Sequence, residues 1–161
     1  MEPILKVADL SKAFSRAGRD AFFAVDHVSF EVQPGEILGI VGESGSGKST
    51  IARLITCQID ATGGQIFIDG QDITRLRGRD LIPVYAKIQM VFQSPADSFD
   101  PRRTLGDGIC ESLRNKGVPK AEREAKARAL LESCGLPTTF LARYPHQVSG
   151  GQCQRAAIAR A

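Results

Sequence analysis

Short apolar runs separated by turn residues divide the first half of the chain into expected strands. Residues 4–7 form one such run, and at 28–32 apolar and polar residues alternate, as in a strand with one buried face. The uninterrupted apolar run at 37–41 follows a Pro34-Gly35 turn and predicts a strand buried on both faces. The pattern therefore predicts a sheet in the N-terminal half.

A second group of strands is expected further along the chain. The run at 66–68 leads into Asp69-Gly70, a dipeptide typical of hairpin turns, and Ile73 is expected to begin a short return strand. Residues 87–92 form another apolar run that predicts a strand. The hairpin makes this part of the sheet antiparallel, unlike a βα core.

Helix-start and helix-end signals dominate the second half. Thr104 can cap a helix that ends near Gly117, and Pro119 suits the first turn of a following helix. Gly135 is expected just past the end of that helix, and Ser149 is a natural cap for a helix running to the last residue. The C-terminal half is therefore predicted to be helical.

Composition and charge exclude several classes of function. The 161 residues suffice for one domain with a core, and the formal net charge of +3 is too small and scattered to indicate nucleic-acid binding. The charges within 120–128 are those of a solvated helix face. No apolar run approaches the roughly 18 residues that span a bilayer, and charged residues interrupt the N-terminus where a signal peptide would be apolar. These features indicate a cytoplasmic chain.

Neither the cysteines nor the histidines form a recognisable site. No two cysteines have the C-x-x-C spacing of a metal site, so reduced thiols in core or surface positions are expected. Neither histidine lies near an obvious nucleophile or carboxylate pair, so structural roles are expected for both. The residues concerned are Cys57, Cys110, Cys134, Cys153, His27 and His146.

A glycine-rich stretch after the run at 37–41 carries the strongest chemical signal. Its sequence is Gly42-Glu43-Ser44-Gly45-Ser46-Gly47-Lys48-Ser49-Thr50. It fits the pattern G-x-x-x-x-G-K-[ST], in which glycines let backbone N–H groups surround a β-phosphate. Lys48 supplies a charge for the β- and γ-phosphates, and Ser49 supplies a hydroxyl for Mg²⁺. A plain glycine-rich turn is the alternative, but the expected strand before it and the helix after it, with apolar Ile51, Leu54 and Ile55 on one face, favour a phosphate site.

Two further features are weaker when taken alone. Ser149 is followed by Gly150 and Gly151, so a hydroxyl, exposed amides and a helix dipole come together as in an anion site, although a capped helix with a flexible entry explains them equally. Phe14 could stack on a purine base, although by itself it fits core or loop packing better.

Together these residues resemble the nucleotide-binding subunit of an ATP-binding cassette (ABC) transporter. The matching motifs, in family order, are the adenine-stacking aromatic Phe14, the phosphate loop, the Q-loop strand Val91-Phe92-Gln93 and the signature Ser149-Gly150-Gly151-Gln152. The resemblance reverses the preference for a packing role of Phe14. Segments 24–30, 42–47, 88–93 and 144–146 are similar to the dipeptide, oligopeptide and nickel importer branch.

The resemblance implies an α/β fold with a P-loop NTPase core, an antiparallel β subdomain and a helical subdomain, truncated before the Walker B strand. The expected parts of this incomplete domain, 1–161, are the β subdomain with the core at 1–93, the helical subdomain at 94–147, and the signature motif with its helix at 148–161. In the family, a Mg²⁺-binding Asp, a water-polarising Glu and a switch His follow the signature helix, and none of the three is found in these 161 residues. The chain is therefore expected to be a truncated copy that hydrolyses ATP poorly alone and leaves an apolar sheet edge open beside 37–41.

The resemblance also implies a mechanism, in which two subunits pair head to tail and power the import of a solute. The importer branch that the chain resembles implies that this solute is a peptide. ATP and Mg²⁺ would lie between the phosphate loop of one subunit and the signature of the other. Lys48 and Gln93 would be catalytic, and Ser49 and Gln93 would contact the metal. The expected partners at the cytoplasmic face of the cell membrane are permease subunits docked on the helical part, a second ATP-binding subunit and, indirectly, a solute-binding protein.

Two departures and two alternatives accompany this hypothesis. Val148 and Cys153 stand where the family commonly has Leu and Arg, and the second change removes a charge. One alternative is a non-hydrolysing module that regulates a partner by binding ATP. The other is a DNA-repair or chromosome-structure ATPase, a class that usually separates the two motifs by long coiled coils or zinc insertions. Here roughly 100 residues without heptads or paired cysteines separate Lys48 from Ser149.

Overall fold

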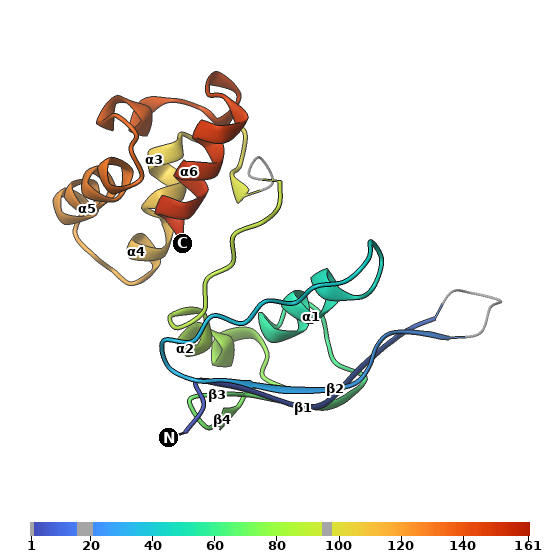
Figure 1. Ribbon diagram of the computed structural model, residues 1–161. Helices are drawn as coiled ribbons and strands as arrows, with labels where there is room; N and C mark the ends of the chain where they lie inside the picture. The colour runs from blue at the N-terminus through green and yellow to red at the C-terminus, as the bar shows by residue number, and fades with distance from the viewer. Residues whose placement is uncertain (1, 16–20, 95–97) are drawn as a thin grey trace. The chain divides into compact units, whose positions relative to one another are not determined.

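The computed structural model describes residues 2–15, 21–94 and 98–161. The chain divides into two compact units, 1–89 and 90–161, and each has a hydrophobic core of its own. The first unit is built on a sheet and the second on helices (Figure 1). Within the described residues, no helix combines the length and apolar composition that crossing a membrane requires.

A four-stranded antiparallel sheet forms the first unit. Its strands are β1 (Leu5–Phe14), β2 (Phe22–Val32), β3 (Gly63–Ile68) and β4 (Gln71–Asp72), in the spatial order β2-β1-β3-β4. The strands expected at 4–7, 28–32 and 66–68 are confirmed, and the first two are longer than the apolar pattern alone indicated. The pairing of β1 with β2 continues through register shifts between Val7 and Leu10 and between Leu10 and Lys12, and such irregularities break the two-residue alternation by which a strand is predicted.

The core of this unit lies between one face of the sheet and helix α1 (Lys48–Ile55) (Figure 1). Ile51 and Leu54 of α1 are buried with Val7, Leu10 and Ile66 of the sheet. The apolar face predicted for the helix is therefore the face that packs on the strands. This packing fixes the start of α1 relative to the sheet.

The hairpin between β3 and β4 turns at the predicted dipeptide. Asp69 and Gly70 have φ of 48° and 73°, which suits a two-residue turn that joins the strands of a hairpin. The expectation that Ile73 begins the return strand is wrong, because β4 ends at Asp72. The Asp72 carboxylate instead accepts hydrogen bonds from the Thr74 amide and hydroxyl, which turns the chain out of the ladder.

The strand expected at 37–41 is absent from the structure, so that prediction is wrong. The segment has no regular secondary structure, and Ile37 and Val41 are 96% and 95% exposed rather than buried on both faces. An apolar run becomes a buried strand only when neighbouring strands pair with it and helices cover it. Among the described residues, no strand pairs with this segment.

The prediction of a strand at 87–92 is also wrong. The chain there follows a 3-10 turn, η1 (Gly78–Leu81), and a short helix, α2 (Ile82–Tyr85). The amides of Lys87 and Ile88 both donate to the carbonyl oxygen of Val84, which extends the helical turn in place of a ladder. Ile88 packs against the sheet core, so the apolar pattern reported burial correctly and conformation incorrectly.

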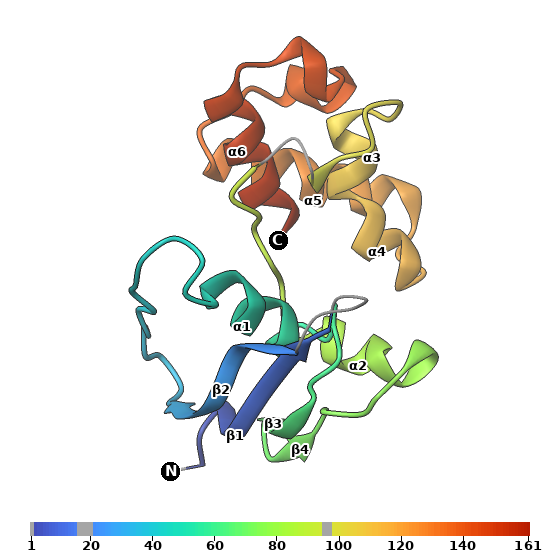
Figure 2. The ribbon, with the colours of Figure 1, turned by 90° about the vertical axis from the view of Figure 1, so that its right-hand side faces the viewer.

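Helices build the second unit, as the sequence predicted. They are α3 (Leu105–Ile109), α4 (Glu111–Asn115), α5 (Lys120–Ser133) and α6 (Gly150–Arg160), with 3-10 turns η3 (Thr138–Ala142) and η4 (Pro145–Gln147). Figure 2 shows α3, α5 and α6 gathered around one core. Leu105, Ile109 and Leu131 are fully buried there with the alanines of α6.

The predicted helix ends are confirmed at most positions. Thr104 caps α3 and exchanges hydrogen bonds with Asp107, and Gly117, with φ of 74°, follows the end of α4. The single helix expected between them is broken into α3 and α4 at Cys110. Gly135, with φ of 67°, follows α5, and Pro119 stands immediately before it.

Candidate functional site

The loop 42–47 leads directly into α1, and its glycines meet real steric demands. Gly45 and Gly47 have φ of 84° and 91°, a backbone conformation that residues other than glycine rarely adopt. A Cβ atom on Gly47 would lie 2.2 Å from the carbonyl oxygen of Ala24 in β2. The end of the loop is therefore pressed against the sheet, where only glycine fits.

The Lys48 side chain folds back over this loop. Its Nζ atom donates to the carbonyl oxygens of Gly42 and Glu43 at 2.8 and 2.6 Å and lies 3.3 Å from the Ser46 hydroxyl. Each acceptor is neutral, so the ammonium charge has no carboxylate partner among the described residues. The loop thus holds a cation at its centre through bonds that an anion can replace.

The start of α1 adds positive potential to the same place. Gly47 is its N-cap and supplies no capping side chain, and no acidic residue lies in the first turn. Ser49 is exposed at this helix start. Uncapped amides, the positive end of the helix dipole and the Lys48 ammonium together form a surface suited to a multiply charged anion.

Phe14 lies at the end of β1 and is exposed rather than buried in the core. Its ring stacks on Phe22 with centroids 5.8 Å apart and an interplanar angle of 29°. Ala24, the residue that touches Gly47, lies two positions after Phe22 on β2. Because a strand rises about 3.3 Å per residue, the aromatic pair lies close to the end of the glycine loop.

The signature segment forms a complete helix cap in the second unit. The Ser149 hydroxyl accepts from the Gln152 amide at 3.3 Å, and the Gln152 side-chain oxygen accepts from the Ser149 amide at 2.9 Å. Gly150 and Gly151 are exposed, and a Cβ atom on either would meet nothing within 4 Å. Nothing in the described chain therefore requires glycine at these two positions.

Cys153 lies one turn further along α6 and belongs to the core. It is 4% exposed, and burial raises the pKa of its thiol. An uncharged side chain is what these surroundings accept, since an unpaired buried cation costs several kcal/mol. Cys153, which stands where the family commonly has a charged Arg, is therefore a packing residue in this chain. Val148 packs, partly buried, against the same core.

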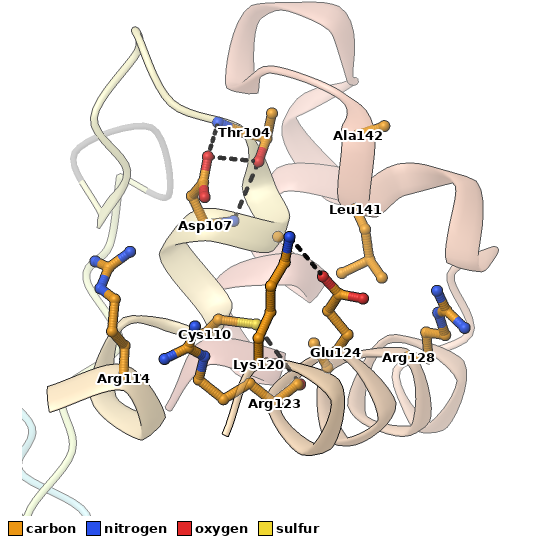
Figure 3. Close-up of a pocket in the computed structure, with 12 residues that line it drawn as sticks. Thr104, Asp107, Cys110, Arg114, Lys120, Arg123, Glu124, Arg128, Leu141 and Ala142 are labelled. Carbon is orange, nitrogen blue, oxygen red and sulfur yellow. Dashed lines mark hydrogen bonds and ion pairs between the residues drawn. The ribbon is translucent and has the colours of Figure 1, made fainter. Parts of the chain in front are cut away.

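A pocket of about 340 Å³ opens between α3, α5 and η3 in the second unit (Figure 3). Its wall carries the cations Arg114, Lys120, Arg123 and Arg128, together with Asp107 and Glu124. Lys120 lies 3.8 Å from Glu124, whereas within the described residues neither Arg123 nor Arg128 has a carboxylate partner. Sequence reasoning assigned the charges within 120–128 to a solvated helix face. The spacing of Lys120, Arg123, Glu124 and Ala127 on one helix face was the available signal.

The structure brings together some of the expected site residues and not others. Phe14 and the loop 42–50 belong to the first unit, where β2 links them. Gln93 is exposed in an irregular segment of the second unit, which also holds Ser149 and its neighbours. Lys12, which contacts Phe14, was not singled out by sequence reasoning.

Comparison with known proteins identifies the class to which this fold and these motifs belong. A match to the ABC transporter family covers residues 25–161, and the chain belongs to that family. The structure superposes with a TM-score of 0.89 on an ATP-binding cassette solved as a dimer in a post-hydrolysis state with ADP and Pi. That cassette is 32% identical, and the match covers 97% of this chain and 68% of the cassette.

Curated relatives place the chain beside import proteins. A putative peptide import ATP-binding protein of Brucella ovis is 44% identical over 161 residues, which is 99% of this chain and 50% of the relative. A glutathione import ATP-binding protein of Escherichia coli O157:H7 is 45% identical over 168 residues, covering 99% of this chain and 27% of the relative. The chain thus spans half or less of the length of these two relatives. The predicted family and importer branch are confirmed.

Proposed function

We propose that this chain supplies the ATP-binding loop and signature of an importer subunit that hydrolyses ATP to move solutes across the cell membrane. The observation that carries the proposal is the loop 42–49, where Lys48 Nζ lies 2.6–2.8 Å from two carbonyl oxygens beside an uncapped helix start. Carbonyl acceptors hold the ammonium more weakly than phosphate oxygens would. A triphosphate can therefore take over the lysine while the first amides of α1 bind its β-phosphate.

Mg²⁺ accompanies the nucleotide in this proposal. Ser49 offers an exposed hydroxyl at the helix start, and Gln93 offers an exposed amide oxygen. These are hard oxygen donors of the kind Mg²⁺ accepts, and the ion usually takes only one or two protein ligands beside phosphates and water. The ion supplies charge neutralisation at the transferring phosphoryl group. Lys48 would stabilise the same charge, and Gln93 would orient the attacking water.

A second subunit completes the site in this proposal. Ser149, Gly150 and Gly151 would face the γ-phosphate bound to the partner subunit's glycine loop, as expected for head-to-tail pairing. The open space beside both glycines supports this role, because alanine would favour the helix by up to about 1 kcal/mol and nothing in the described chain forbids it. Glycine is the residue that allows another molecule's atoms close approach.

Permease subunits are the proposed membrane partners, which would place the protein at the cytoplasmic face of the membrane. The pocket between α3, α5 and η3 supports docking on the second unit, because it is concave and carries two guanidinium groups with no carboxylate partner among the described residues (Figure 3). Such a surface fits a segment that bears carboxylates or ends in a helix C-terminus. Peptides are the proposed solutes, by similarity to the Brucella relative.

Titration of the 161-residue chain with a fluorescent ATP analogue tests the nucleotide assignment. Lys48→Ala is expected to lower the affinity at least about 30-fold, since hydrogen bonds to charged groups are worth about 1.5–3 kcal/mol and the lysine meets two phosphates. Lys116→Ala, at an exposed position of the second unit, is the control and should bind like the unmodified chain. Equal affinities for all three proteins would refute the loop assignment.

Phosphate release measured beside an added intact partner subunit separates hydrolysis from binding alone. Turnover that depends on Lys48 supports the ATPase. Tight ATP binding without turnover in that mixture would favour the regulatory module instead.

A further inference from the structure

Lys12 joins the exposed aromatic side chain to the segment that follows α1. It lies on β1 two residues before Phe14, and its Nζ atom is 5.1 Å from the centroid of the Phe14 ring. The same atom donates to the carbonyl oxygen of Asp60 at 2.6 Å. A cation at this distance over a ring is within the range of cation–π attraction.

The anchor of Lys12 is itself held in place. The Asp60 carboxylate pairs with Arg77 at 2.8 Å. The Thr62 amide donates to the Ser11 carbonyl oxygen at 2.9 Å, and the Thr62 hydroxyl accepts from the Ala13 amide at 3.0 Å. These bonds tie the segment around 60–62 to β1, so the ammonium of Lys12 is fixed relative to the strand that carries Phe14.

The Phe14 ring needs the Lys12 contact because its place at the strand end does not fix its orientation. The side chain is 36% exposed at the end of a strand, and its described ring neighbour, Phe22, is itself 52% exposed. An exposed aromatic side chain loses rotational freedom when a base stacks on it, which costs affinity. A cation that selects one ring orientation beforehand lowers that cost.

We propose that Lys12 is a positioning residue, which holds the Phe14 ring in the orientation that receives the base of the nucleotide. This role rests on the proposed ATP binding and adds a named residue to it. The ammonium group acts through Phe14 and not on the phosphates. Its contribution should therefore appear only for ligands that carry a base.

Calorimetric titration of the 161-residue chain with ATP and with inorganic tripolyphosphate tests this assignment. Lys12→Met, which keeps most of the aliphatic stem, is expected to weaken ATP binding about threefold and to leave tripolyphosphate binding unchanged. Lys12→Arg should restore ATP affinity, because a guanidinium also binds aromatic faces. In a Phe14→Ala background, Lys12→Met should have no further effect on ATP.

Three results would overturn the proposal. They are unchanged ATP affinity in Lys12→Met, an equal loss for ATP and tripolyphosphate, and a threefold loss that persists in the Phe14→Ala background. The last two are what a purely structural tie to Asp60 predicts, and circular dichroism melting reports that tie separately. Failure of the ATP-binding proposal is distinguishable, because Lys48→Ala would then leave binding of both ligands unaffected.

Discussion

The helices α1 and α6 both begin beside glycines, yet their first turns are completed in different ways. The start of α1 has no capping side chain, and its one cation rests on neutral carbonyl oxygens of the loop. The start of α6 is closed by Ser149 and Gln152, which satisfy each other's amides. The first start leaves its amides to solvent or a ligand, whereas the second satisfies its own cap and offers only a hydroxyl and bare glycines.

The glycines at the two helix starts also differ, because Gly47 has no room for a side chain and Gly150 does. This difference gives the largest expected effect on stability. Gly47→Ala would place Cβ 2.2 Å from the Ala24 carbonyl oxygen at a φ of 91°, so the first unit should lose about 3 kcal/mol of stability together with nucleotide binding. Gly150→Ala is the matched control, since its Cβ atom would meet nothing within 4 Å. Urea denaturation should find the control unchanged or stabilised by less than about 1 kcal/mol. Similar losses in both variants would remove the distinction between the two helix starts.

Removing the cap of α6 should have a smaller effect, and one on stability alone. Ser149→Ala leaves the Gln152 amide without its acceptor, so we expect a loss of about 1 kcal/mol in urea denaturation followed by helical ellipticity. ATP binding to the loop 42–49 of the same chain should not change. Ser149→Thr retains the hydroxyl and serves as the control. A loss of ATP affinity without a loss of stability would contradict this separation of roles.

The smallest expected effect is a pH dependence confined to the first unit. His27 Nδ1 lies 2.7 Å from an Asp9 carboxylate oxygen, and this hydrogen bond, with the charges of Asp9 and then Asp26, raises the His27 pKa. The folded state therefore binds the proton more tightly. The stabilisation is fully present below the ordinary histidine pKa and is lost as pH rises through the raised value.

Asp9→Asn tests this dependence, because asparagine tolerates the φ of 53° found at this position. Melting temperatures between pH 5.5 and 8 should fall less steeply with pH in the variant than in the unmodified chain. Parallel profiles would show that the pair does not contribute.

Local signals made much of this fold predictable. Thr104, Ser149 and the Asp69-Gly70 turn act on backbone groups within three residues of themselves, so their roles can be read from the sequence. The run at 37–41 could not be read this way, since its conformation depends on strands that pair with it and not on its own composition.

The candidate site likewise has parts that could be predicted from the sequence and parts that could not. The glycine loop follows from one contiguous pattern, and the structure adds the reason that Gly47 cannot change. The pocket beside α5 draws its wall from three segments, and the Lys12 contact depends on a carbonyl oxygen 48 residues away. The spacing of charges along α5 indicates one wall of the pocket, but the contacts between distant residues leave no pattern along the chain.

The burial of Cys153 gives the signature helix its own reporter. Its sulfur lies one turn beyond the Ser149 cap and is almost sealed from solvent, so a thiol-specific reagent reaches it only when α6 opens. Fraying at the cap would thus become visible as the labelling rate of Cys153, without any substitution in the chain.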